Sequence, residues 1–349
     1  MARIAAVAPV LPEFAYPQDE ITRELAPLLT SRTGQRAVME RMHAASGIGV
    51  RHTALPLERY RELGDFSSTN AIFIEVATDL AARALTDALD AVGLSPRDVD
   101  YVMFTSVTGI SAPSIDAILV SRLGLRPDVK RLPSYGLGCV GGAAGLARVN
   151  DYLVGHPDEV GVLLSVELCS LTLQRDDASM ANFVATGLFG DGAAAVVLVG
   201  DNRAEPGPSI IDTRSFFYPD SHGVIGFNVG TTGFEIVLTA GVADVIAEHF
   251  PGNAAAFLGD NGMAVSDIGA WFAHPGGPRV LEAFTSSLGL EREDLALSYA
   301  SLEKVGNLSS SAVLHVLADG FAQPAATRGL LFALGPGVSA EFVLMEWPS

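Results

Sequence analysis

The chain has 349 residues, of which 49% are hydrophobic and 18% charged, and its formal net charge at pH 7 is −18. This size suits one large globular unit or two closely fused domains, and the acidic balance argues against nucleic acid or anionic membrane as a partner. The sequence has no run of about 18 uncharged apolar residues, so we predict no membrane-spanning helix.

The two cysteines have no close cysteine partner, which argues against a disulfide framework or metal site and favours a reducing, cytoplasmic setting.

An apolar run opens the chain. Ile4 to Val10 follows Arg3, a pattern that faintly resembles a secretory signal peptide. The run is short and is broken by Pro9 and Pro12, so we expect the first core strand there rather than a leader.

Further along, two stretches predict helices and one predicts a linker. Residues 68–90 carry apolar positions at helical spacing over a long amphipathic stretch, and residues 143–153 start with small side chains directly after a glycine turn. The polar, proline-containing segment 201–219 predicts a linker.

Four sequence elements recur in the same order at a spacing of about 145–170 residues. The pairs are Ser95–Gly109 with Val265–Gly277, Leu123–Asp128 with Leu288–Asp294, Gly136–Gly145 with Lys304–Val313, and Leu188–Val199 with Ala333–Met345. Four matches in register indicate duplication of one α/β unit, and strands that alternate with helices predict sheets covered by helices. We place the halves at residues 1–200 and 201–349, and expect the loops after matched strands to converge on one site.

Cys139 lies on a glycine turn where a helix is expected to begin. The free N–H groups and the dipole of a helix start lower the pKa of a thiol, and a backbone N–H there can hold an oxyanion. These features favour a nucleophile that accepts an acyl thioester. The alternative is a small buried hydrophobic residue, which is our interpretation of Cys169 at the end of an apolar strand.

His274 follows an apolar strand in the motif WFAHPGGP, where a sharp turn presents its imidazole at the strand end. A neutral imidazole can take the proton of a thiol, and an imidazolium stabilises a thiolate. A buried structural histidine fits the same pattern. The remaining histidines lack such a setting and are interpreted as surface or structural residues.

Asn307, in KVGNLSSSAV, also follows a glycine at an expected helix start. Its amide can donate a hydrogen bond to an oxygen that becomes negative, although asparagine is also a common N-cap. Together, Cys139, His274 and Asn307 fit decarboxylative condensation. The thiolate holds one acyl group, and the two donors stabilise the enolate formed when a malonyl thioester loses CO2, each donor contributing about 3 kcal/mol. No metal or other cofactor is required.

At these residues the chain resembles the type III polyketide synthases of the chalcone and stilbene synthase superfamily. The matching motifs are LGLRPDVKRLPSYGLGCVGG, GLFGDGAAAV, WFAHPGGP, GNLSSSAV and GPGVSAE, which cover most of the chain and weaken towards the N-terminus. The resemblance implies a thiolase-like α/β fold with five αβαβα layers, a homodimer and a Cys139–His274–Asn307 triad. It implies an acyltransferase that loads an acyl-CoA starter on Cys139, extends it with malonyl-CoA or a substituted malonyl-CoA, and cyclises the product.

The same resemblance implies further site residues. Phe189 in GLFGDG corresponds to an aromatic gatekeeper between a CoA tunnel and the reaction cavity. Of the basic residues that bind CoA phosphates in plant members, Arg41 has a clear counterpart, and Arg36 and Arg51 are candidates to complete the set. The residues expected to shape the cavity are Val107, Ala112, Phe227, Ile236 and Ser309.

Several cavity positions are small or aliphatic where plant members carry Met or aromatic side chains; Ala112 stands where a Met crosses into the partner's cavity. We therefore expect an alkyl starter and an alkylpyrone or alkylresorcinol product. One alternative is a ketoacyl-ACP synthase III-like enzyme that performs a single condensation on a carrier protein. Another is a scaffold that has lost catalysis, which the complete triad argues against.

Overall fold

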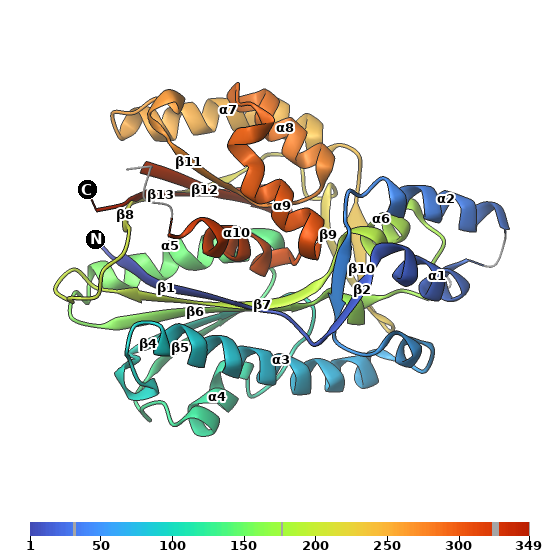
Figure 1. The fold of residues 1–349 in the computed structure, drawn as a ribbon, viewed down its shortest axis with the longest axis horizontal. Helices are drawn as coiled ribbons and strands as arrows, with labels where there is room; N and C mark the ends of the chain where they lie inside the picture. The colour runs from blue at the N-terminus through green and yellow to red at the C-terminus, as the bar shows by residue number, and fades with distance from the viewer. Residues whose placement is uncertain (31–32, 176, 323–327, 349) are drawn as a thin grey trace.

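The computed structural model describes residues 1–30, 33–175, 177–322 and 328–348. Its main sheet has the strand order β11-β12-β13-β8-β1-β7-β6-β4-β5. Within the described residues, β1 (Arg3–Val10) and β8 (Ser209–Phe217) pair at one position, Arg3 with Ser209. The sheet therefore divides there into two groups of strands (Figure 1).

The strands of each group come from one part of the chain. The first group contains β1, β4 (Tyr101–Thr105), β5 (Lys130–Ser134), β6 (Val160–Leu168) and β7 (Asp191–Val199), and the second contains β8, β11 (Ala270–Ala273), β12 (Arg328–Gly335) and β13 (Ser339–Glu346). Two small antiparallel pairs, β2 (Phe14–Pro17) with β3 (Val50–Thr53) and β9 (Ile225–Gly230) with β10 (Gly233–Leu238), lie apart from the main sheet. Duplication of one unit stays a prediction.

Helices fill the space between the two groups of strands and cover their outer faces (Figure 1). The central layer holds α5 (Gly141–Val154) and α10 (Ala312–Gly320); α5 contacts β4 and β6 on one side and β12 and β13 on the other. The outer layers hold α3 (Phe66–Asp90) and α4 (Ile115–Leu123) on one face, and α7 (Val242–Asp260) and α8 (Pro278–Leu288) on the other, with α9 (Ala296–Val305) beside α10. This arrangement confirms the expected thiolase-like α/β fold.

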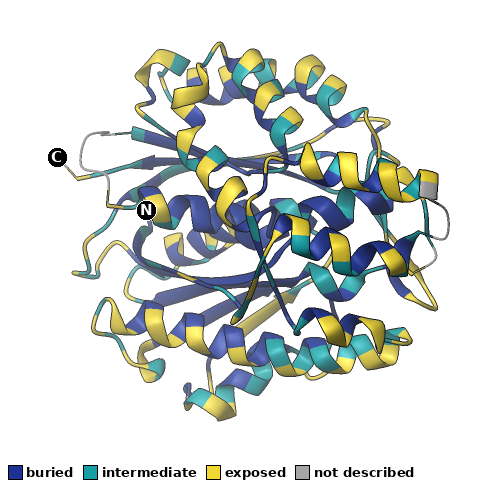
Figure 2. Cartoon of the chain, turned by 45° about the vertical axis from the view of Figure 1, so that its right-hand side comes forward, coloured by how far each residue is buried: buried dark blue, intermediate teal, exposed yellow. Residues whose placement is uncertain are grey.

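Helices on both faces of the strands explain the unusually apolar composition. Every residue of β6 and β7 is buried, as expected for strands without a solvent face. Figure 2 shows the buried residues concentrated in the central strands and the exposed residues on the outer helices. Against the second group of strands, Phe250 of α7 and Phe284 of α8 pack on Phe332 of β12, with ring centroids about 5 Å apart.

The remaining helices gather at one end of the sheet, on the right of Figure 1. They are α1 (Gln18–Leu29), α2 (Thr33–Ala44) and α6 (Met180–Leu188). With the hairpin β9–β10 they cover the carboxyl ends of the parallel strands β4 and β6. The candidate site lies at this end.

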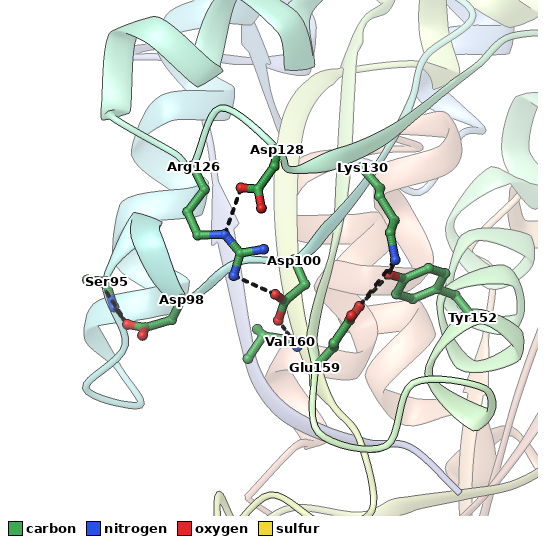
Figure 3. Close-up of polar contacts among 9 residues, drawn as sticks. All are labelled: Ser95, Asp98, Asp100, Arg126, Asp128, Lys130, Tyr152, Glu159 and Val160. Atoms are coloured by element: carbon green, nitrogen blue, oxygen red, sulfur yellow. Dashed lines mark hydrogen bonds and ion pairs between the residues drawn. The ribbon is translucent and has the colours of Figure 1, made fainter.

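At the opposite end of β4, β5 and β6, polar contacts hold the strand starts together (Figure 3). Arg126 donates to the Asp100 carboxylate at 2.7 Å, and the same carboxylate accepts from the backbone N–H of Val160 at 2.8 Å. Lys130 Nζ donates to the Tyr152 hydroxyl at 2.6 Å. These contacts fix the parallel strands far from the site.

The structure confirms the first strand and both predicted helices, and shows that the predicted linker is wrong for residues 209–217. The first strand is β1, and the helices are α3, which begins at Phe66 after the N-cap Asp65, and α5. Segment 209–217 is β8, which pairs along its length with β13. Its sequence SIIDTRSFF is rich in β-branched and aromatic residues, whereas the prolines of the predicted linker, Pro206, Pro208 and Pro219, lie outside the strand.

Within the described residues, no helix is both long and apolar enough to cross a membrane. The same part of the chain contains no cluster of three His, Cys, Asp or Glu side chains suited to a metal ion. The cytoplasmic location stays a prediction.

We predict that Gly142→Ala destabilises the protein. A Cβ there would lie 2.3 Å from the Ser310 carbonyl oxygen and 2.9 Å from Val313 Cγ1, so α5 must move from the turn before α10, at a cost of about 1–3 kcal/mol. The matched control is Gly252→Ala in α7, where no atom lies within 4 Å and alanine should be neutral or stabilise by up to about 1 kcal/mol. Urea unfolding measures both, and equal midpoints would contradict the packing described.

Candidate active site

A cavity lies beneath α1, α6 and the hairpin β9–β10, with an empty volume of about 930 Å³ including its open mouth. The hairpin supplies one wall, through Ile225, Gly226, Phe227, Phe234 and Ile236. The other apolar lining residues include Ile21, Leu25, Leu57, Leu173, Ala185, Phe189 and Pro336, and the polar ones are Arg51, Thr53, Tyr60, Thr108, Cys139, Cys169, Ser170, Thr172, Gln174, Asn182, Thr186 and Ser309. The two free thiols of the chain thus line the same space.

Cys139 lies in a single helical turn, Gly138–Val140, directly before α5. Gly138 has a positive φ of 55°, and a Cβ on it would lie 2.5 Å from Pro336 Cδ, so glycine alone suits the turn. The Cys139 thiol donates to Ser309 Oγ at 3.8 Å. The turn therefore brings a thiol from the first half of the chain against a hydroxyl from the second.

Burial raises the pKa of the Cys139 thiol to about 12, and the nearby charge of Glu167 raises it further. Hydrogen bonds from Ser309 and Asn307 act in the opposite direction. The sequence predicted a pKa lowered by the helix start. That prediction is wrong, because desolvation of the thiolate outweighs its hydrogen bonds.

His274 directly follows β11, and its backbone N–H donates to the Phe332 carbonyl of β12 at 2.9 Å. The side chain is 3% exposed, and among the described residues neither ring nitrogen has a hydrogen-bond partner. Burial lowers the pKa of His274 to about 3, so the imidazole is neutral at pH 7. A neutral imidazole with both nitrogens unoccupied can exchange a proton with a bound molecule.

The strand ends place His274 on the same side of the sheet as Cys139. β11 and β12 are parallel, so their carboxyl ends meet at one edge. A Cβ at Gly335, the last residue of β12, would lie 2.6 Å from the Leu137 carbonyl oxygen and 2.7 Å from Val140 Cγ1. The end of β12 therefore packs on the turn that carries Cys139, and His274 ends the neighbouring strand.

Asn307 is 2% exposed. Its backbone bonds to the segment around Phe189, and its side chain contacts the Cys139 thiol. Its backbone N–H donates to the Leu188 carbonyl at 2.9 Å, and its carbonyl accepts from the Gly190 N–H at 3.0 Å. Its side-chain oxygen accepts from the Ser309 N–H at 2.8 Å. The N-cap of the turn Ser309–Ser311 is Leu308, so Asn307 is not the helix cap that the sequence left open. The amide group remains available to act on the Cys139 thiol, whose pKa it lowers.

Glu167, which the sequence analysis missed, lies at the centre of the buried polar contacts. Its carboxylate is fully buried and accepts from the Val107 N–H at 3.1 Å, the Thr108 hydroxyl at 2.9 Å and the Ser309 hydroxyl at 3.3 Å. Burial raises the pKa of this carboxyl. The available signal was a single acidic residue in the otherwise uncharged strand VGVLLSVEL.

The structure brings together some of the predicted site residues and separates others. Cys139, Phe189, Phe227, Ile236 and Ser309 line one cavity. Two expected cavity residues are absent from its described lining. The Val107 side chain is buried while its neighbour Thr108 faces the space, and Ala112 lies on an exposed loop. The partner cavity expected for Ala112 stays a prediction.

The three predicted CoA-binding arginines occupy two different environments. Arg36 and Arg41 are exposed on α2, where Arg36 pairs with Glu40 at 2.8 Å. Arg51 lies in β3, is 4% exposed and lines the cavity. This position argues against a contact between Arg51 and surface-bound CoA phosphates.

We predict that Ser309→Ala slows alkylation of Cys139 at pH 8 by about three- to tenfold and moves its rate–pH curve to higher pH. When the thiol ionises, the Ser309 hydroxyl can donate to the sulfur instead of to Glu167. The substitution removes this hydrogen bond to the thiolate, so the pKa of the thiol rises. Iodoacetamide labelling, read at Cys139 by peptide mass spectrometry, measures the rate. Thr172→Ala is the control, since Thr172 lines the cavity but its hydroxyl bonds to the Cys169 carbonyl; an equal effect there would contradict the assignment.

Comparisons with known proteins agree with this arrangement. Residues 1–202 match the family model for chalcone and stilbene synthases, N-terminal domain, and residues 210–347 match that for the C-terminal domain. A 1,3,6,8-tetrahydroxynaphthalene synthase from Streptomyces peucetius subsp. caesius is 49% identical, over 99% of this chain and 93% of the relative. Phloroglucinol synthase from Pseudomonas fluorescens is 31% identical, over 97% of this chain and 98% of the relative.

Among solved structures, the 1,3,6,8-tetrahydroxynaphthalene synthase of Streptomyces coelicolor A3(2), a bacterial type III polyketide synthase, matches with a TM-score of 0.93 and 27% identity. The match covers 99% of each chain. Enzymes of this kind are acyltransferases that act on CoA thioesters. The chain belongs to the chalcone and stilbene synthase family and is a type III polyketide synthase.

Proposed function

We propose that Cys139, His274 and Asn307 are the catalytic residues of this polyketide synthase. The Cys139 sulfur attacks the carbonyl carbon of an acyl-CoA, His274 takes the thiol proton, and CoA leaves. The observation that carries this proposal is the contact of Cys139, in the cavity wall, with Ser309 and with the buried Asn307. Because burial holds Cys139 protonated and His274 neutral at pH 7, the thiol needs a base, and the imidazole is able to act as one.

In chain extension, Asn307 and His274 are proposed to act as hydrogen-bond donors. A malonyl thioester loses CO2 and leaves an enolate, whose oxygen accepts hydrogen bonds from the Asn307 amide and the His274 ring. The enolate carbon then attacks the acyl carbonyl on Cys139, a carbon–carbon bond forms and the sulfur leaves. Buried donors suit this task because they need no reorganisation as the charge develops.

Two starter classes fit the cavity. The first is malonyl-CoA itself, with a polyhydroxylated aromatic product. In 1,3,6,8-tetrahydroxynaphthalene, the product named for the 49%-identical relative, the oxygens of each ring stand on alternate carbons, a pattern that malonyl units alone can build. The many hydroxyl, thiol and amide groups of the lining suit a chain of repeated ketones.

The second class is an aliphatic acyl-CoA, with an alkylpyrone or alkylresorcinol product. Ile21 and Leu25 of α1 line the cavity together with Leu57 and Leu173. This apolar wall suits a hydrocarbon chain.

A panel of CoA thioesters tests the activity and the starter. We expect purified protein given free malonyl-CoA, alone or with alkyl-CoA starters, to release CO2 and form an aromatic or pyrone product, and Cys139→Ala to abolish acylation. An enzyme of the ketoacyl-ACP synthase III kind would ignore free malonyl-CoA and require a carrier protein. Absence of CO2 and product across the panel would reject the proposed function.

Asn307→Ala separates the two partial reactions within the same assay. Because the amide is proposed to stabilise the enolate, CO2 release should fall by about 100-fold or more, while acylation of Cys139, read by intact mass, falls much less. Equal losses in both reactions would show that the proposed division of roles is incorrect.

Other residues complete the proposed site. Phe189, which lines the cavity next to Asn307, is proposed as the gatekeeper between the CoA entry and the reaction space. Arg36 and Arg41, exposed on α2, are proposed to contact the phosphates of CoA, since the overall charge of the chain is otherwise unfavourable to an anionic substrate.

We also propose that the enzyme is a homodimer paired through the edge of the sheet at β5. In the described residues β5 pairs with β4 alone, and Leu132 of β5 is 45% exposed, near the exposed Ile110 and Tyr135. An unprotected edge with apolar side chains is a surface that a second copy can cover.

We predict that Leu132→Glu shifts the protein from dimer to monomer in size-exclusion chromatography with light scattering, because the new charges face each other across the two-fold interface. Val154→Glu is the matched control, since Val154 at the end of α5 is 61% exposed and lies away from β5. A monomeric wild-type protein, or a dimer unaffected by Leu132→Glu, would contradict this interface.

A further inference from the structure

Two buried side chains, Gln18 of α1 and Arg51 of β3, bind the backbone where α6 ends. Gln18 Nε2 donates to the Gly187 carbonyl at 2.7 Å. Arg51 Nη1 donates to the Phe189 carbonyl at 2.7 Å, and its Nε donates to Gln18 Oε1 at 2.8 Å. The last carbonyls of a helix have no partner within the helix, and its dipole favours a cation at that end. Gln18 and Arg51 therefore fix the direction in which the chain leaves α6.

Asn307 binds the neighbouring peptide groups of the same segment. Its backbone N–H donates to the Leu188 carbonyl at 2.9 Å, and its carbonyl accepts from the Gly190 N–H at 3.0 Å. Asn307 and Phe189 thereby form an isolated parallel bridge. The Asn307 backbone is thus tied to the end of α6, which the two buried side chains hold.

The aliphatic part of Arg51 packs on the glycines next to Asn307 and Phe189. A Cβ at Gly306, directly before Asn307, would lie 3.1 Å from Arg51 Cγ and 3.2 Å from Arg51 Cδ. A Cβ at Gly190, directly after Phe189, would lie 3.7 Å from Arg51 Cβ. Burial lowers the pKa of Arg51 only to about 10, so the group remains a cation at pH 7. One charged side chain therefore contacts both segments.

Both residues held in this way belong to the proposed site. Phe189 lines the cavity, and the Asn307 side chain contacts the Cys139 thiol. Cys139 itself lies in the separate turn before α5, where Gly138 packs on Pro336. A displacement of the end of α6 would therefore move Asn307 more than the thiol. Moving a functional group by about 1 Å can cost about 100-fold in rate.

We propose that Gln18 and Arg51 are positioning residues for chain extension, which hold the end of α6 so that the Asn307 amide meets the enolate oxygen. This inference rests on the proposed role of Asn307. The two side chains act through backbone hydrogen bonds and need no contact with the substrate. Their loss should weaken decarboxylation of malonyl-CoA much more than acylation of Cys139, because acylation uses the side chains of Cys139 and His274.

The test is the ratio of two rates in each variant. One is CO2 release from malonyl-CoA at saturation, and the other is acylation of Cys139 by malonyl-CoA and by hexanoyl-CoA, read by intact mass as the sum of all acyl adducts. Arg51→Met removes the donor to the Phe189 carbonyl and should lower the ratio of CO2 release to acylation about tenfold or more. Arg51→Lys restores the charge and a donor, so it should recover part of the ratio.

Gln18→Glu separates positioning from stability. The new carboxylate still accepts from Arg51 Nε and adds a charge beside the cation, which limits the loss of stability. Ionised there, it cannot donate to the Gly187 carbonyl, so the ratio should again fall about tenfold. This variant decides the question if Arg51→Met fails to fold.

Arg126→Met is the control for a general loss of stability, because it removes the contact with Asp100 at the opposite end of the sheet. It should change both rates by the same factor and leave the ratio at the wild-type value. A wild-type ratio in both Arg51→Met and Gln18→Glu, beside a selective loss of CO2 release in Asn307→Ala, would overturn the positioning role alone. Equal losses of both reactions in Asn307→Ala would instead refute the role of Asn307 and the inference that depends on it.

Discussion

The close approach of the start of α5 to the turn before α10 is the contact on which the site depends. A side chain at Gly142 would collide with the Ser310 carbonyl, and one at Gly138 would collide with Pro336. Because these glycines leave room for a close approach, Cys139 from the first half of the chain reaches Ser309 from the second. The two central helices thus join the strand groups and also set the geometry around the thiol.

Glu167 stabilises this contact from the first half. A buried carboxylate is costly unless its oxygens are satisfied, and here hydroxyl groups from Thr108, Ser309 and Ser310 supply the hydrogen bonds, together with a backbone N–H. The donors lie in the loop that follows β4 and in the turn before α10, so the carboxylate links both parts of the chain. Its charge also acts on Cys139, and the same group that orders the site therefore opposes ionisation of the thiol.

The sequence was sufficient to predict the fold class, the first strand, two helices and, through the family resemblance, three residues that line the cavity: Phe227, Ile236 and Ser309. These depend on hydrophobic periodicity and on motifs whose glycines have a local geometric reason. It was insufficient for β8, because the nearby prolines favoured a linker and the strand depends on pairing with β13 at the far end of the chain. It was also insufficient for the pKa of Cys139, because desolvation depends on atoms contributed by distant segments, while a helix start is visible locally.

The environment of Arg51, a predicted CoA-binding residue, could likewise not be predicted from the sequence. The family resemblance made Arg51 a candidate to bind CoA at the surface, but it lies in β3, which pairs with β2, and its side chain is buried. Whether a charged side chain faces solvent or a cavity depends on such long-range packing, which single-sequence motifs do not contain.

The hairpin β9–β10 is a separate two-stranded pair that forms one wall of the cavity. It is attached to the body by Gln174, which donates to the Phe234 carbonyl at 3.1 Å, and by the edge-on contact of Phe234 with Phe66. Substitutions at Phe227 or Ile236 can therefore reshape the reaction space without disturbing the strands that hold Cys139, His274 and Asn307. The shape of the cavity can therefore change through this hairpin, while the position of the proposed catalytic residues stays the same.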